Sequence, residues 1–190
     1  PIFFFLRKAG FHGKLVGWFH SPIFASSYTL KRKIKESLFQ KFISNQLKFV
    51  DLVLAISSGI ERQVKRLLTN VKTSVVYNPV LFDNFIDIQP IQKSNKIIFA
   101  YVGRIDNYSK NLTFMFKGLS KLKFEWLLKI IGTGPDEEML RELSRKLGIS
   151  SRIKWLGFSE RPFELLREEG VTALLLTSRF EGLGIVLIEA

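Results

Sequence analysis

The sequence has no cysteine, so disulfides and thiolate metal sites are excluded. It also has only two histidines. No apolar run approaches the roughly 20 residues that a helix needs to cross a bilayer. The opening PIFFF is too short for such a span, is followed at once by Arg7 and Lys8, and lacks the ordered regions of a signal peptide. Because the chain begins with Pro1 and stops in mid-pattern at Ala190, we expect a piece of a longer protein.

Acidic residues are scarce in the first part of the chain. Residues 1–80 carry 13 Lys and Arg against three Asp and Glu, whereas residues 81–190 carry 16 against 14. The net charge of +12 therefore divides into +10 and +2. The first part should attract an anionic partner, which could be a nucleic acid, an anionic membrane surface or a phosphorylated substrate.

Short apolar strands alternate with amphipathic helices along the chain. The expected strands are Leu15–His20, Asp51–Ile56, Lys72–Tyr77, Lys96–Val102, Trp126–Ile131, Ile153–Leu156 and Val171–Thr177. The expected helices are Thr29–Phe49, Ser58–Leu68 with a serine cap, Asn111–Leu122, Asp136–Leu147, Pro162–Glu169 and a last helix that begins near Leu183 or Gly184. This alternation predicts α/β structure with parallel sheets covered on both faces.

The chain divides into two such units. Residues 81–95 have no clear period and contain proline, glutamine and serine, which marks a linker. We therefore expect one unit in residues 1–80 and a second in residues 96–190, both incomplete.

In parallel sheets, ligands bind at the turns that follow the carboxyl ends of the strands. Three turns in the second unit carry distinctive residues: GRID with Lys110 further on, GTGP, and SRFEGLG. In the last turn, glycines let backbone N–H groups approach a ligand, and a helix N-terminus favours a phosphate. Glu181 and Glu189 on either side could accept hydrogen bonds from hydroxyls, and Arg104 with Lys110 could neutralise a diphosphate. This arrangement suits a nucleotide-sugar.

The motifs VGRIDNYSKN, IIGTGP and SRFEGLGIVLIEA resemble, in order, the donor-domain motifs of the family 4 retaining glycosyltransferases, which have the GT-B fold of two Rossmann-like domains. The two glutamates match the E-x7-E signature of that family. HSP, LAISSGI and VVYNPV are similar to its acceptor-domain elements, so residues 1–80 would be the C-terminal part of that domain and 96–190 the N-terminal part of the donor domain. The pattern is especially similar to the lipopolysaccharide 1,6-galactosyltransferase branch.

The resemblance implies roles for individual residues. Arg104 and Lys110 would hold the donor diphosphate, and Gly103 would keep the first turn close to the ligand. Glu181 would contact the hydroxyls of the donor sugar and Glu189 the ribose. The remaining residues implied are His20 near the reaction centre and, as further substrate-binding positions, Gly134, Gly182, Leu183 and Gly184.

The resemblance also implies a reaction that retains the anomeric configuration without a metal or other cofactor, and the sequence has no convincing D-x-D motif. The expected donor is UDP-galactose or UDP-glucose, and the expected acceptor is a cell-surface glycan or glycolipid. The glycine-rich loop near the N-terminus of the family and the segment after E-x7-E are missing. We therefore expect the 190-residue piece to be inactive by itself.

The basic helix in residues 30–48 is typical either of a solvated face or of a helix that docks on an anionic membrane. The second possibility predicts a cytoplasmic protein that is peripheral on the inner face of the plasma membrane.

Two other functions stay open. One is a nucleic-acid binder, although no recognised motif supports it and we expect no nucleic acid as a partner. The other is a dinucleotide-dependent oxidoreductase, although Gly132-Thr133-Gly134-Pro135 lacks the G-x-G-x-x-G spacing.

Overall fold

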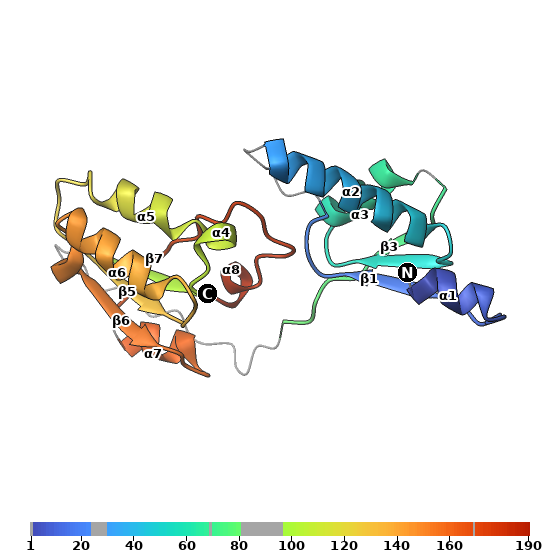
Figure 1. Cartoon of the computed structure of the whole chain (residues 1–190). Coiled ribbons are helices and arrows are strands. Elements are labelled where there is room, and N and C mark those ends of the chain that lie inside the picture. Colours follow the sequence, from blue (N-terminus) through green and yellow to red (C-terminus); the bar gives the residue numbers. More distant parts are fainter. Residues whose placement is uncertain (1, 24–29, 69, 81–96, 169) are drawn as a thin grey trace. The chain divides into compact units, whose positions relative to one another are not determined.

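The computed structural model describes residues 2–23, 30–68, 70–80, 97–168 and 170–190, with the side chains of residues 30–36 and 168 outside the described part. The chain forms two compact units (Figure 1). The first comprises Pro1–Pro79 and Phe180–Gly184, and the second comprises Val80–Arg179 and Ile185–Ala190. The expected linker 81–95 lies outside the described residues.

The first unit is a parallel three-stranded sheet with helices. Its strand order is β1-β2-β3, and Val16 of β1 pairs with Leu52 of β2, while Val53 of β2 pairs with Thr73 of β3. Its elements are α1 (Ile2–Lys8), β1 (Val16–Phe19), α2 (Leu30–Leu47), β2 (Leu52–Ala55), α3 (Ser58–Leu67) and β3 (Thr73–Val75).

The helix α2 packs on the core through a different stripe from the one that its sequence favours. The four-residue spacing in the sequence includes Leu38 and Phe42, but these side chains are 62% and 44% exposed. Instead, Leu47 is buried beside Val53, and Ile43 packs against the same cluster. Leu38 and Phe42 lie roughly opposite Leu47 on a 3.6-residue helix, so both stripes cannot face the core.

Asp51 fastens the start of β2 to the N-terminal helix. Its Oδ2 accepts hydrogen bonds from the Leu15 N–H at 2.7 Å and from the Arg7 guanidinium at 2.6 Å. The Leu15 N–H, more than the neighbouring charges, holds the pKa of Asp51 below its ordinary value of 3.8. A lowered folded pKa means that this carboxylate stabilises the fold above pH 3.8 and that the stabilisation is lost as pH falls through the folded pKa.

We therefore expect Asp51→Asn to destabilise the protein near neutral pH, with a difference from wild type that shrinks as the solution is acidified below pH 3.8. Chemical denaturation of both proteins at several pH values measures this. Glu160→Gln, which removes an exposed carboxylate, is the charge-matched control. A difference that is the same at every pH would rule out the ionised Asp51 as its source.

The second unit is a parallel four-stranded sheet with the strand order β6-β5-β4-β7. The register aligns Ile97 of β4 with Trp126 of β5 and Phe99 of β4 with Ala173 of β7. Its elements are β4 (Ile97–Val102), α4 (Asn107–Lys110), α5 (Leu112–Leu119), β5 (Trp126–Ile131), α6 (Glu137–Lys146), a 3-10 turn (Ser150–Arg152), β6 (Ile153–Gly157), α7 (Pro162–Glu168), β7 (Ala173–Leu174) and α8 (Val186–Glu189).

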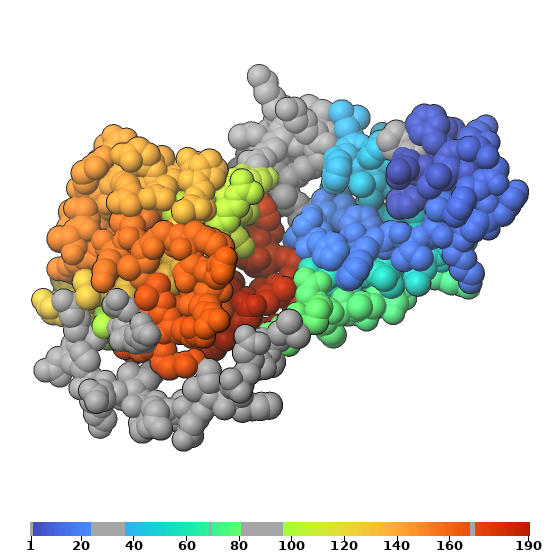
Figure 2. Space-filling view, turned by 90° about the horizontal axis from the view of Figure 1, so that it is seen from below, coloured from blue at the N-terminus to red at the C-terminus, as the bar shows by residue number. Residues whose placement is uncertain are grey.

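Apolar side chains cover both faces of this sheet. Tyr101 and Leu128 point to the face covered by α5 and α6, where Phe116 and Leu140 are fully buried. Ala100 and Ile131 point to the other face, where Leu166 of α7 packs on them. Figure 1 shows these helices on the two sides of the sheet, and α7 is orange in Figure 2. The predicted parallel α/β class is confirmed.

Several elements differ from the sequence expectation, and one of them is α1, which has no counterpart among the expected helices. The strand β7 covers only Ala173–Leu174 rather than Val171–Thr177. The last helix begins at Val186 rather than near Gly184, since glycine favours helix poorly. The helix α4 was not anticipated. It ends at Asn111, whose φ of 55° places it in the left-handed region that asparagine tolerates.

Candidate active site

The turn after β4 holds two of the predicted site residues. Gly103 has a φ of 149°, and its N–H donates to the Ile131 carbonyl at 3.0 Å. The hydroxyl of Tyr101 donates a hydrogen bond to the Arg104 carbonyl at 2.7 Å, which fixes the backbone of the turn. The Arg104 side chain is exposed and forms no ion pair with a residue that the structure describes.

Asp106, two positions after Arg104, is not its ion-pair partner. Its carboxylate accepts from the Tyr108 N–H and the Ser109 hydroxyl, both at 3.0 Å, so it caps α4.

The turn after β5 lies directly against the first turn. The Ile105 N–H donates to the Thr133 carbonyl at 2.9 Å, and the Asp136 N–H donates to the Ile105 carbonyl at 3.3 Å. A Cβ on Gly132 would collide with the Gly103 carbonyl, and one on Gly134 would collide with the Ile105 carbonyl. Both glycines are therefore required for the two backbones to approach.

Asp136 links the same two turns. Glu137 and Glu138 occupy the first turn of α6, and Asp136 precedes that turn without capping the helix. Its Oδ2 accepts instead from the Asn107 N–H at 2.7 Å. The contact joins residues 29 positions apart, so only the fold reveals it.

These turns enclose a pocket of about 430 Å³. Three predicted residues, Gly103, Arg104 and Gly134, come together in its wall. Phe158, which follows β6, also lines it and is 72% exposed. Sequence reasoning missed Phe158. Its position directly after a strand of the same sheet was the available signal, since strand ends meet at one edge.

Side chains of the turn after β7 donate hydrogen bonds to backbone carbonyls of α4, including that of Lys110. The Thr177 hydroxyl donates to the Lys110 carbonyl at 3.1 Å. The Arg179 guanidinium donates to the Asn107 and Tyr108 carbonyls at 2.9 and 2.8 Å. Arg179 was not among the predicted residues, although it lies within the SRFEG motif. Its planar fork, which can bind two acceptors at once, was the signal for such a clamp.

In the first unit, the backbone of His20 lies against Gly182 of the SRFEGLG turn. His20 follows β1, is exposed, and its ring lies 4.5 Å from the Trp18 ring between centroids. A Cβ on Gly182 would collide with the His20 carbonyl, and Leu183 packs beside the buried Ile56.

The remaining predicted residues lie in or beyond that turn. Glu181 and Gly184 are half-buried and belong to the first unit, whereas Glu189 is exposed at the end of α8 in the second unit.

Chemically, the carboxyl edge of the second sheet suits an anion near Arg104 rather than at the start of α6. Glu137 and Glu138 occupy the first turn of α6 and would repel a phosphate there. Glycine turns beside a cation at the carboxyl ends of parallel strands are where α/β proteins of this architecture bind their ligands.

The chain belongs to the glycosyl transferases of group 1, whose family model matches residues 83–190. It is 36% identical over 188 residues to the lipopolysaccharide 1,6-galactosyltransferase of Salmonella typhimurium (strain LT2), a match that covers 97% of this chain and 48% of that protein. The family resemblance predicted from the motifs is therefore confirmed.

Solved structures agree on the fold. The apo form of the lipopolysaccharide outer core galactosyltransferase WaaB matches with a TM-score of 0.74 and 34% identity over 97% of this chain and 48% of that one. Sucrose-phosphate synthase from Thermosynechococcus elongatus matches with a TM-score of 0.78 over 97% of this chain and 49% of that one, and at 15% identity it shows the fold alone. The chain spans about half the length of these relatives.

Two features are absent from the residues that the structure describes. No three His, Cys, Asp or Glu side chains gather there as a metal site would require. Within the same part of the chain, no helix has the length and apolar character needed to cross a bilayer.

Proposed function

We propose that the protein transfers a hexose from a nucleotide-sugar, UDP-galactose or UDP-glucose, to a cell-surface glycan or glycolipid with retention of configuration. The observation that carries the proposal is the pocket in which Gly103, Arg104 and Gly134 meet at the carboxyl edge of the second sheet. The name of the Salmonella relative, a lipopolysaccharide galactosyltransferase, supports the donor and acceptor class. Residues 96–190 would then belong to the donor domain and residues 1–80 to the acceptor domain.

In this proposal the charge of the donor diphosphate is met by Arg104 and Lys110. As the bond between the anomeric carbon and the phosphate oxygen breaks, negative charge grows on the departing diphosphate, and these cations stabilise it. The acceptor oxygen bonds to the anomeric carbon from the same face, and its proton passes to the departing phosphate oxygen. The proposed mechanism uses neither a metal nor another cofactor.

The other predicted residues position the two substrates. Glu181 accepts hydrogen bonds from hydroxyls of the donor sugar, and Glu189 accepts from the ribose. The amides of Leu183 and Gly184 donate to the phosphate, and Gly182 leaves room for that approach. His20 would lie on the acceptor side of the reacting carbon.

The test is product analysis with the protein expressed from its complete reading frame. UDP-galactose and UDP-glucose are each incubated with lipopolysaccharide core acceptors of graded length, and NMR of the product reports the anomeric configuration. Transfer with an α linkage from an α-linked donor supports the proposal. Release of a β-linked product, or transfer only from a non-nucleotide donor, would reject it.

We further propose that the acceptor unit docks peripherally on an anionic membrane at its cytoplasmic face. The C-terminal half of α2 supports this proposal, because residues 37–47 contain one lysine and no acid. Leu38, Phe39 and Phe42 there are 62%, 51% and 44% exposed. Lys41 is also exposed and lies about 60° around the helix from Leu38. Exposed apolar side chains beside a cation suit the interface of an anionic bilayer.

The variant Phe39→Ser/Phe42→Ser should bind vesicles of 30 mol% phosphatidylglycerol in phosphatidylcholine about tenfold more weakly than wild type, since two apolar side chains no longer enter the interface. Co-sedimentation measures the partition. Phe114→Ser, which removes a 65% exposed phenylalanine from the second unit, is the control. Equal binding of the double variant and wild type would exclude α2 as the docking face.

A further inference from the structure

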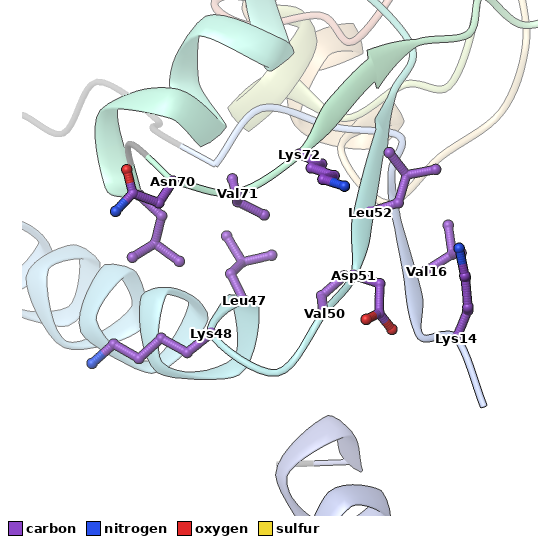
Figure 3. Close-up of a pocket in the computed structure, with 11 residues that line it drawn as sticks. Lys14, Val16, Leu47, Lys48, Val50, Asp51, Leu52, Asn70, Val71 and Lys72 are labelled. Carbon is purple, nitrogen blue, oxygen red and sulfur yellow. The ribbon is translucent and has the colours of Figure 1, made fainter. Parts of the chain in front are cut away.

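A second pocket lies at the opposite edge of the first sheet from His20 (Figure 3). Its volume is about 670 Å³, within the range of small-molecule sites. Val16 and Leu52, the first residues of β1 and β2, line it, as does Lys72 immediately before β3. Because β1, β2 and β3 are parallel, these residues mark the amino-terminal edge. His20 follows the other end of β1.

The rim of this pocket has an excess of positive charge. Lys14, Lys48 and Lys72 line it, all with exposed side chains, and Asp51 is the one acidic residue among the described residues of its wall. The Asp51 carboxylate is bound by Arg7 and by the Leu15 N–H. Its charge is therefore offset by Arg7, and the three lysines leave the pocket net positive.

The lysines do not form one cluster. In Figure 3, Lys48 lies at one end with Asn70, and Lys14 lies at the other. The Lys48 ammonium donates to the Asn45 side chain at 3.1 Å, which holds it on the last turn of α2. An anion with more than one charged or polar group could therefore reach both ends.

The floor between the lysines is apolar. Leu47 is 3% exposed, and Val50 and Val71 are half-buried beside it. None of the lining residues that the structure describes is aromatic, so these residues offer a nucleobase nothing to stack on. Among the described lining residues, Asn70 is the one uncharged polar side chain, which offers few hydrogen bonds to a bare sugar rich in hydroxyls.

We infer that this pocket binds the phosphate headgroup of an anionic phospholipid, with the first methylenes of its acyl chains against Leu47, Val50 and Val71. The phosphate is met by Lys14 and Lys72. The inference deepens the membrane contact proposed above and rests on it, because a bilayer is the source of such a ligand. It gives the acceptor unit a headgroup site in addition to the α2 face.

The test uses dihexanoyl phosphatidic acid below its micelle concentration, so that no bilayer is needed. Methyl resonances of Leu47, Val50 and Val71 report occupancy in NMR titrations. We expect saturable shifts with this lipid, and weaker binding of zwitterionic dihexanoyl phosphatidylcholine and of glycerol 3-phosphate, which lacks the chains. Lys14→Ser/Lys72→Ser should weaken the binding about tenfold.

Lys121→Ser/Lys123→Ser removes the same charge from exposed positions of the second unit and should leave the titration unchanged. Equal loss in this control, or none in Lys14→Ser/Lys72→Ser, would overturn the site. Glycerol 3-phosphate or inorganic phosphate binding as tightly as the lipid would show a soluble phosphate ligand and overturn the lipid. If the pocket binds lipid but Phe39→Ser/Phe42→Ser still sediments with vesicles, only the α2 proposal fails.

Discussion

Replacing Arg104 and Lys110 together with alanine should lower kcat/KM for sugar transfer by roughly 10³-fold, since removal of one preorganised charge-stabilising donor typically costs about 10²-fold or more. Most of the loss should fall on kcat, because charge on the diphosphate grows as the glycosidic bond breaks. Arg104 lies in the wall of the pocket, and the Thr177 hydroxyl anchors the backbone carbonyl of Lys110. Steady-state kinetics with a UDP-hexose measures both parameters.

Lys117→Ala is the matched control, because it removes an exposed cation from α5 in the same unit. Its kcat/KM should equal that of wild type. Circular dichroism and thermal unfolding of the double variant separate lost chemistry from lost folding. A folded double variant that keeps more than a tenth of wild-type kcat/KM would place the diphosphate elsewhere.

Gly132→Ala should destabilise the second unit by about 3–5 kcal/mol, because a strained φ and a backbone collision each cost about 1–3 kcal/mol. Gly132 has a φ of 137°, and a Cβ there would collide with the Gly103 carbonyl. For a chain of this size the loss corresponds to a fall in Tm of roughly 6–20 °C. Differential scanning calorimetry measures the change.

Variants at two other glycines distinguish the cost of backbone strain from the cost of the collision. Gly148 has a φ of 70°, but a Cβ there meets no atom within 4 Å, so Gly148→Ala should cost only the backbone strain. Gly118 lies in α5 with open space around it and no positive φ. Gly118→Ala should therefore stabilise the protein by about 0.5–1 kcal/mol. A loss in Gly132→Ala no larger than in Gly148→Ala would mean that the two turns can separate.

The sequence predicts most of the second unit because its local signals agree with its tertiary packing. The strand expected at Trp126–Ile131 has those bounds in β5, and every residue in it except one is buried. In the first unit the expected serine cap is also confirmed, since the Ile60 N–H donates to the Ser57 hydroxyl at 3.3 Å. The glycines at 103 and 134 stand in turns after neighbouring strands, so their meeting follows from parallel topology.

The features that sequence reasoning missed depend on contacts between distant residues. Asp136 lies at the start of a helix in the sequence, but its carboxylate bonds a neighbouring turn. Arg179 reaches back across more than 70 positions to hold α4. On α2, two apolar stripes compete for the core, and the contacts with Val53 and Val64 determine which one is buried. Helical spacing alone cannot choose between them.

The central claim is that a nucleotide-sugar binds at the carboxyl edge of the second sheet. The most direct measurement is an NMR titration of the complete protein with UDP, following the glycine amide resonances. We predict that UDP shifts the amides of Gly103, Gly132 and Gly134 saturably, that NAD does not, and that Arg104→Ala weakens UDP binding at least about tenfold. Saturable binding of UDP that leaves these three amides unmoved would contradict the account.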